Sequence, residues 1–197
     1  MSTAPVERAG ELPAGVASAE TAEDAARLWA GHSPEVTRRR ELVWQDPVPT
    51  AGIGAQMTGL DYMRAIVAAE VPPPPIAVTL NFKPVEVDDG RAVFEGSPGE
   101  EHYNPIGVVH GGYASTLLDS ALGCAVHTTL PRGFAYTTLT LEVKMTRPIT
   151  RETGSVRAIA EVLHRGRRQS TAEARLLSVD GEKLLAHGTS TCMVMEL

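Results

Sequence analysis

Apolar and polar positions alternate with a period of two over most of the C-terminal half of the chain, which is the pattern of half-buried β-strands. In the stretch 136–147, Leu139, Leu141, Val143 and Met145 share one face. Further strands are predicted over 155–163, 170–179 and 183–195, with turn signals at Arg165-Gly166-Arg167 and Asp180-Gly181. Four strands therefore follow one another through short connections.

The middle of the chain mixes helical and strand-like patterns. Residues 59–70 carry apolar side chains at helical spacing, and the four prolines 72–75 end this predicted helix. Strands are predicted over 79–87 and 91–96, joined by the turn signal Asp88-Asp89-Gly90. Residues 112–130 are apolar nearly all round and precede Pro131, which predicts a buried helix.

This order of elements is a helix, two strands, a long buried helix and four strands. It is typical of an α+β domain in which an antiparallel sheet covers a central helix, and not of a βαβ fold. We place this domain at residues 56–197.

Residues 1–55 form a separate N-terminal extension in this interpretation. The stretch 1–20 is polar and rich in Ala, Glu and Pro, so we expect it to be disordered. A short helix is predicted over 21–31, with Thr21 as its N-cap. Residues 42–44 form either a short strand or a hydrophobic tether onto the main body.

The composition excludes several classes of protein. The chain has 197 residues, 43% hydrophobic and 21% charged, which suits one globular domain with an appendage. A formal net charge of −6 argues against a nucleic-acid partner. Two cysteines cannot build a disulfide framework, and no apolar run is long enough for a membrane helix or a signal peptide. We expect a cytoplasmic protein with no membrane partner.

Asp119 is the single formally charged residue between Glu101 and Arg132, and it lies in the most apolar predicted helix. Burying an isolated carboxylate costs several kcal/mol unless it is paired or protonated. One interpretation is a structural or surface-facing Asp bonded to hydroxyls such as those of Ser115 or Ser120. The other is a general base or a nucleophile.

The same helix opens with His110-Gly111-Gly112. Backbone N–H groups at a helix start have no intrahelical partner and suit an anion or a developing oxyanion. Gly111 and Asp119 are eight residues apart, just over two turns, so they lie on roughly the same side of the helix. Simple turn geometry is the alternative explanation for the two glycines.

These residues belong to a motif that resembles the signature of the PaaI-like acyl-CoA thioesterases of the hotdog superfamily. The resemblance covers roughly residues 59–197. It implies a hotdog fold, with about six antiparallel strands wrapped around a long helix, and hydrolysis of an acyl-CoA thioester to a carboxylic acid and coenzyme A. The matching positions are His102, Asn104, Pro105, Gly107, His110, Gly111, Gly112, Leu117 and Asp119.

The resemblance also implies roles for individual residues. Asp119 matches the carboxylate that attacks the thioester carbonyl or activates water. Gly111 matches the backbone N–H that polarises the carbonyl oxygen, and Asn104 matches the residue that positions the thioester or the water. Thr138, with Thr137 as the adjacent alternative, matches a hydroxyl that the family usually takes from the partner subunit.

Other motif positions are assigned to the loop and to substrate binding. His110 and Gly112 line the substrate at the helix start, and His110 either shapes the loop or takes part in the chemistry. His102 and Gly107 are assigned to loop architecture. No metal site is expected, because there is no HExxH motif and no ligand-like spacing of Cys or His. No cofactor is expected either, because coenzyme A is part of the substrate.

Charge is distributed unevenly along the chain. Residues 1–100 carry 8 basic and 15 acidic side chains, whereas residues 101–197 carry 10 and 9. Arg165, Arg167 and Arg168 cluster at one turn. They are either solvated turn residues or contacts for the phosphates of coenzyme A.

The family's sites lie at a dimer interface, so the resemblance implies a homodimer or homotetramer with the active site between subunits. Two other functions stay open. One is a non-catalytic acyl-CoA-binding regulatory module, and the other is a hotdog dehydratase or hydratase. The latter works with a His paired with an acidic residue, whereas His102 precedes Asp119 by 17 residues and the helix opens with Gly-Gly instead of Pro-Gly.

Overall fold

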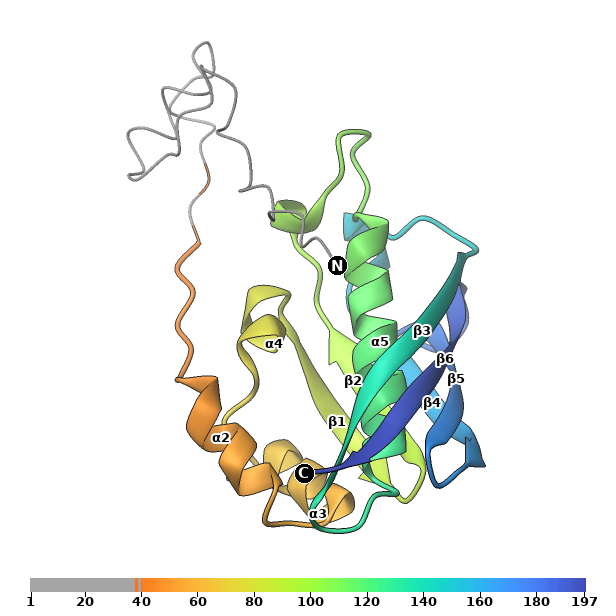
Figure 1. Ribbon diagram of the computed structural model, residues 1–197. Coiled ribbons are helices and arrows are strands. Elements are labelled where there is room, and N and C mark those ends of the chain that lie inside the picture. The colour runs from red at the N-terminus through yellow and green to blue at the C-terminus, as the bar shows by residue number, and fades with distance from the viewer. Residues whose placement is uncertain (1–37, 39) are drawn as a thin grey trace, which may run out of the picture. The chain divides into compact units, whose positions relative to one another are not determined.

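The computed structural model describes residue 38 and residues 40–197 (Figure 1). Residues Leu42–Leu197 form one compact unit. The predicted disorder over 1–20 and the predicted helix over 21–31 lie outside the described residues. The division after residue 55 stays a prediction.

A six-stranded antiparallel sheet has the strand order β1-β2-β4-β5-β6-β3. This confirms the predicted α+β hotdog architecture, and it leaves β1 and β3 at the two edges. Gly90 and Gly181 take positive φ angles of 78° and 76° in the predicted turns. The strands are β1 Phe82–Asp88, β2 Arg91–Gly96, β3 Phe134–Met145, β4 Val156–Arg165, β5 Gln169–Ser178 and β6 Leu184–Glu196.

Helix α5, Gly111–His127, packs against all six strands inside the curve of the sheet (Figure 1). Its buried side chains form the centre of the core, and Leu117, Leu118 and Leu122 are fully inaccessible to solvent. The expected burial on all sides is wrong for one side of the helix. That side is partly exposed and carries the small or polar residues Gly112, Ser115, Thr116, Asp119 and Ser120.

In the part of the chain that the structure describes, three helices precede the sheet, namely α2 Pro47–Gly54, α3 Gly59–Val67 and α4 Pro75–Thr79. Helix α3 confirms the predicted amphipathic helix but ends before Ala69, which takes a φ of 59°. Helix α4 was not predicted. Pro75 occupies its first position, where the fixed φ of proline favours a helix start, so the strand predicted from residue 79 begins only at Phe82.

Residues 42–44 do not form a strand. The side chains of Val43 and Trp44 are 75% and 57% exposed, so they do not tether the segment to the main body. In the described part of the chain, no helix has the length and apolar character needed to cross a membrane.

Short 3-10 turns are formed by Glu100–His102 and Arg151–Thr153. The first lies in the loop that leads from β2 into α5. The second follows β3. The Val109 N–H donates a hydrogen bond of 2.9 Å to the Ile149 carbonyl, so the two loops lie side by side next to the start of α5.

Candidate active site

Asp119 and Thr138 meet between helix α5 and the edge strand β3. The Thr138 hydroxyl donates a hydrogen bond of 3.0 Å to Asp119 Oδ1. Among the residues that the structure describes, Asp119 Oδ2 has no hydrogen-bond partner, and the side chain is partly exposed. The carboxylate is therefore oriented by one bond and keeps a free oxygen. Ser115 and Ser120, the structural partners considered from the sequence, do not bond to it.

Strand β3 has a β-bulge next to the hydrogen bond between Thr138 and Asp119. Thr138 pairs with Cys192 and Thr140 with Thr191, so Leu139 is an extra residue without a partner on β6. The single face predicted for Leu139, Leu141, Val143 and Met145 is therefore interrupted at Leu139. Bulges of this kind change the aim of nearby side chains and are common next to active sites.

The loop before α5 is held by Asn104. Its Oδ1 accepts hydrogen bonds from the backbone N–H groups of Ile106 and Val108, at 3.1 and 3.2 Å. Gly107 closes the same turn with a φ of 82°, a conformation that favours glycine. Because only Oδ1 is engaged, the Asn104 Nδ2 group keeps its donors for a ligand, as no described residue accepts from it.

His110 is the N-cap of α5. Its Nδ1 accepts a hydrogen bond of 2.8 Å from the Gly112 N–H, and the His110 N–H donates to the His102 carbonyl. His102 is buried, accepts from the Gly99 N–H through Nδ1, and packs against Tyr113 with ring centroids 4.9 Å apart and ring planes tilted by 48°. Both histidines thus hold the loop.

Gly111 is the first residue of α5, and its N–H has no hydrogen-bond partner in the described part of the chain. It borders a groove of about 320 Å³ between the loop 108–111 and residues 145–149 after β3. Arg147 lies at this groove and was not among the residues that the sequence suggested for phosphate contacts.

Gly111 and Asp119 of one chain are too far apart to act on one carbonyl group. Eight residues of α-helix rise about 12 Å, whereas a C=O bond is about 1.2 Å long. One thioester can therefore not contact the Gly111 N–H and the Asp119 carboxylate of the same chain.

Tyr136 packs against helix α5 at Gly123, about one turn after Asp119. The Tyr136 ring lies where a Cβ on Gly123 would be, 2.5 Å from that position, and its hydroxyl is 4.0 Å from Cys124 Sγ. Burial raises the pKa of Cys124 to about 12 and raises the pKa of Tyr136 well above its ordinary value. Neither group is ionised near neutral pH, so Cys124 is not a thiolate nucleophile. The sequence offered no signal for this cluster.

The arginine turn lies near the other end of α5. Arg165 donates to Asp89 at 2.8 Å, and the neighbouring Gly90 N–H donates to Thr128 at the C-terminal end of the helix. Arg167 and Arg168 are exposed. Since the 17-residue helix is about 25 Å long, the structure does not bring these arginines to Gly111 of the same chain.

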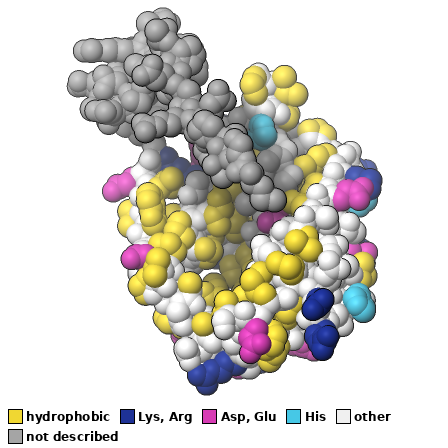
Figure 2. Space-filling model, viewed as in Figure 1, with side chains coloured by type: hydrophobic (Ala, Val, Ile, Leu, Met, Phe, Trp, Pro, Cys, Tyr) yellow, Lys and Arg dark blue, Asp and Glu magenta, His cyan; other side chains and the backbone are white. Residues whose placement is uncertain are grey.

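Strand β3 exposes apolar side chains along the open edge of the sheet. Leu139, Leu141 and Met145 are 47%, 37% and 48% exposed. Figure 2 shows hydrophobic side chains gathered on the face that carries α5 and β3, around a hollow in that face. Within the described ranges, no group of three His, Cys, Asp or Glu side chains could hold a metal ion.

Comparisons with known proteins give a consistent result. The model of the Thioesterase superfamily matches residues 106–185. A phenylacetic acid degradation-related protein of Ralstonia eutropha JMP134 is 30% identical, with a TM-score of 0.61, and the match covers 67% of this chain and 98% of that one. A thioesterase family protein of Silicibacter pomeroyi is 26% identical, with a TM-score of 0.61, covering 68% and 99%.

A more distant structure shares the fold alone. The PaaI protein from the phenylacetic acid degradation operon of E. coli is 20% identical, with a TM-score of 0.60, and the match covers 71% of this chain and 96% of that one. No curated protein matches the chain.

Proposed function

Because the chain belongs to the thioesterase superfamily, as a PaaI-like hotdog protein, it is a thioester hydrolase, and we propose that it cleaves acyl-CoA esters with Asp119 as the acting carboxylate. The observation that carries this proposal is the Asp119 carboxylate itself. It projects from the partly exposed side of α5, is oriented by Thr138, and keeps one oxygen unbonded within the described residues.

The chemistry needs only groups that the chain supplies. As a general base, Asp119 takes a proton from water while the water oxygen attacks the thioester carbon, and the carbonyl π electrons move to oxygen. When the carbonyl re-forms, the C–S bond breaks and coenzyme A leaves as the thiolate, which then takes up a proton. As a nucleophile, Asp119 would instead attack the thioester carbon and expel coenzyme A as the thiolate, and water would then hydrolyse the resulting anhydride to the free acid and the Asp119 carboxylate.

Hydrogen-bond donors at the start of α5 can stabilise the negative charge that develops on the carbonyl oxygen. The unpartnered Gly111 N–H and the positive end of α5 stabilise an oxyanion there. The Asn104 Nδ2 group is a second donor from the adjoining loop. Arg147, beside the same groove, is a cation within reach of the phosphates of coenzyme A.

Two copies of the chain are needed to assemble this site. A two-fold axis near Ser115, midway between Gly111 and Asp119, would set two α5 helices antiparallel and bring Gly111 of one copy to Asp119 of the other. Ser115 and Thr116 are small and partly exposed there, which favours close approach. In this arrangement Thr138 serves the Asp119 of its own chain, and the partner contributes Gly111 and Asn104.

The open edge of β3 favours the same dimer. An edge strand presents unpaired N–H and C=O groups that another strand can pair with, and pairing two β3 strands would continue the sheet across the interface. It would also cover the exposed Leu139, Leu141 and Met145.

Release of free thiol from a panel of acyl- and aryl-CoA esters tests the activity. We expect turnover of at least one member of the panel by the purified protein, recorded with a thiol reagent. Tight acyl-CoA binding without thiol release from any ester would instead favour a binding module. Hydration of an enoyl-CoA would favour a hydratase.

Mixed dimers test the division of the site between subunits. A dimer of one Asp119→Asn chain and one Gly111→Pro chain keeps one intact site, so we expect about half the wild-type activity per mixed dimer. Each variant alone is expected to be nearly inactive. The two chains would carry different affinity tags, and tandem purification followed by the thiol assay gives the measurement.

The reciprocal mixture is the control. A dimer of one wild-type chain and one chain with both substitutions has a defect in each shared site, and we expect no activity. If this dimer were half active and the first mixture inactive, the whole site would lie within one chain.

A further inference from the structure

Tyr136 on strand β3 lies beside the place where Asp119 and Thr138 meet. It precedes Thr138 by two residues in a regular stretch of the pairing between β3 and β6, so both side chains point to the same face, roughly 7 Å apart along the strand. On α5, Gly123 follows Asp119 by one turn, or about 6 Å along the helix axis. Because the Tyr136 ring contacts the helix at Gly123, it lies about 6 to 7 Å beyond the carboxylate, toward the end of α5.

The Tyr136 ring is held in this position from two sides. A Cβ on Gly123 would lie 2.5 Å from the ring atom Cε2, so the ring packs directly against the helix there. The ring of His127 packs against Tyr136 with centroids 5.6 Å apart, and the Tyr62 ring meets His127 edge-on with centroids 5.8 Å apart. Tyr136 is only partly buried, so a group bound next to Asp119 can contact it. Tyr136 is therefore a fixed surface at the edge of the candidate site.

The surfaces around Asp119 decide where the acyl half of a thioester lies. The proposed function, on which this inference rests, places coenzyme A in the groove beside Gly111 of the other copy. Leu141 faces the same side of β3 as Thr138, and pairing of two β3 strands would cover the surface in its direction. The acyl half therefore extends the other way along β3, toward Tyr136.

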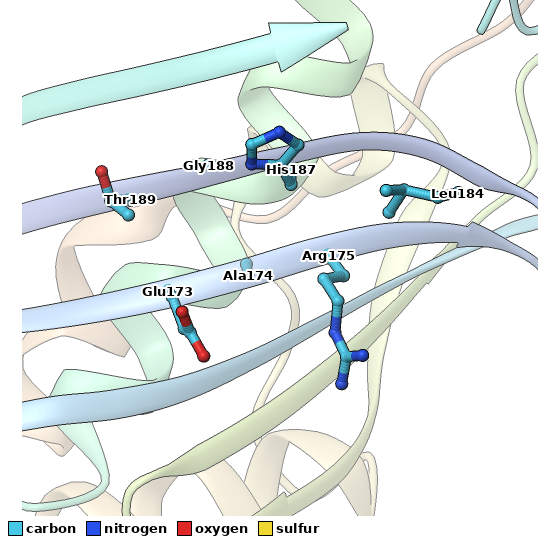
Figure 3. A pocket seen from close by; sticks show the side chains of 7 residues that line it. All are labelled: Glu173, Ala174, Arg175, Leu184, His187, Gly188 and Thr189. Atoms are coloured by element: carbon cyan, nitrogen blue, oxygen red, sulfur yellow. The ribbon is translucent and has the colours of Figure 1, made fainter. Parts of the chain in front are cut away.

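The depression on the outward face of the sheet is no alternative site for the acyl group. It lies between β5 and β6 and has a volume of about 400 Å³. Glu173, Arg175 and His187 are among the residues that line it, and Figure 3 shows Glu173 and Arg175 leaving β5 in the same direction. Charged side chains lose hydration when hydrocarbon covers them, so this surface disfavours an acyl chain. The sheet also separates it from α5, because Glu173 and Arg175 alternate with the buried residues of β5.

We propose that Tyr136 sets the upper size of the acyl group that this enzyme hydrolyses. The distance of about 6 Å from Asp119 to the ring accommodates between four and five carbon–carbon bonds, since each bond of ~1.5 Å advances an extended chain by roughly 1.3 Å. The substrates are therefore acyl-CoA esters of straight-chain acids with up to about six carbons, counting the carbonyl carbon. Longer straight chains would have to displace the ring from the helix.

The dependence of kcat/KM on chain length tests this assignment. The substrates are straight-chain esters from acetyl-CoA to tetradecanoyl-CoA, and the release of free thiol gives the rate. For the wild type we expect kcat/KM to be at least about 100-fold lower with decanoyl-CoA than with hexanoyl-CoA, because a pocket of fixed size rejects each surplus methylene group by about tenfold or more.

Removal of the ring should lengthen the accepted chain. A tyrosine side chain has the apolar area of roughly four methylene groups or more. In Tyr136→Ala we therefore expect the ratio of kcat/KM for decanoyl-CoA to that for butanoyl-CoA to rise about 100-fold above the wild-type ratio, at about fourfold for each methylene group that becomes buried. The ratio stays informative where absolute activity falls, because both esters are hydrolysed at the same carboxylate.

Tyr136→Phe is the matched control. It keeps the ring and removes only the hydroxyl, which is 4.0 Å from Cys124 Sγ, so the ratio for the two esters should stay at the wild-type value. Tyr136→Val is a second shortened variant, because a β-branched residue suits a strand and leaves a smaller cavity than alanine. We expect it to raise the ratio less than alanine does. Thermal unfolding of each variant shows which of them fold.

Three results would overturn the assignment of Tyr136. They are equal hydrolysis of decanoyl-CoA and butanoyl-CoA by the wild type, a wild-type ratio in the folded alanine or valine variant, and an alanine-like ratio in Tyr136→Phe. Each of them leaves the proposed function standing, because thioesters are still hydrolysed. Absence of thiol release from every ester by the wild type would overturn the proposed function, and the role of Tyr136 with it.

Discussion

Replacing Asp119 by asparagine is expected to lower kcat/KM for acyl-CoA hydrolysis by about 10³-fold or more, because the amide can neither accept a proton nor attack carbon. The fold should be retained. The Thr138 hydroxyl donates to Oδ1 of Asp119, and the carbonyl oxygen of asparagine can accept the same hydrogen bond. Steady-state kinetics with a thiol reagent, together with thermal unfolding, gives both quantities.

Ser120→Ala is the control for this variant. Ser120 is the next residue on the same partly exposed side of α5, and its hydroxyl makes no bond to Asp119. We expect its kinetics and melting temperature to match the wild type. A correctly folded Asp119→Asn protein with kcat/KM within tenfold of the wild type would exclude Asp119 as base or nucleophile.

Replacing Gly111 by proline is expected to lower kcat by about 10²- to 10³-fold, the effect of losing one oxyanion donor. Proline lacks the backbone N–H but is well tolerated at the first position of a helix, which Gly111 occupies. His110 already has the extended backbone, with φ −60° and ψ 138°, that a following proline requires. The substitution therefore removes the donor with little expected change in the fold.

The variant Gly111→Ala separates the effect of losing the N–H donor from the effect of adding a side chain at this position. Alanine keeps the N–H, and its Cβ would meet only Met145 Cε at 3.4 Å, an ordinary contact distance. We expect near wild-type activity from alanine and a large loss from proline. Equal activity of the two variants would show that the Gly111 N–H does not stabilise the transition state.

The regular elements could be predicted from the sequence because their apolar periods are long and their turns carry clear signals. Helix α5 and the four strands after it lie within three residues of their predicted ends. Strand β1 begins three residues after its predicted start at residue 79, because the unpredicted helix α4 extends to Thr79.

The candidate site was predictable in part. Composition, helix-start chemistry and the family resemblance predicted Asp119, Gly111 and Asn104 as site residues, and their catalytic roles stay predictions. The arginines predicted to contact coenzyme A, namely Arg165, Arg167 and Arg168, lie near the opposite end of α5 from Gly111, whereas Arg147 lies at the groove beside Gly111. The spacing of Gly111 and Asp119 on one side of α5 suggested a shared site. Their distance along the helix, compared with the length of one carbonyl group, indicates instead that the two groups of one chain cannot act on the same thioester.

The bulge at Leu139 has a consequence for assembly. An open edge strand of 12 residues could pair with a second copy in several registers, and each slip by one residue would reverse the faces of its side chains. A bulge interrupts the regular hydrogen-bonding edge at one place, so slipped pairings set a distorted segment against a regular one. The extra residue thus favours a single alignment of the two β3 strands and opposes open-ended growth of the sheet.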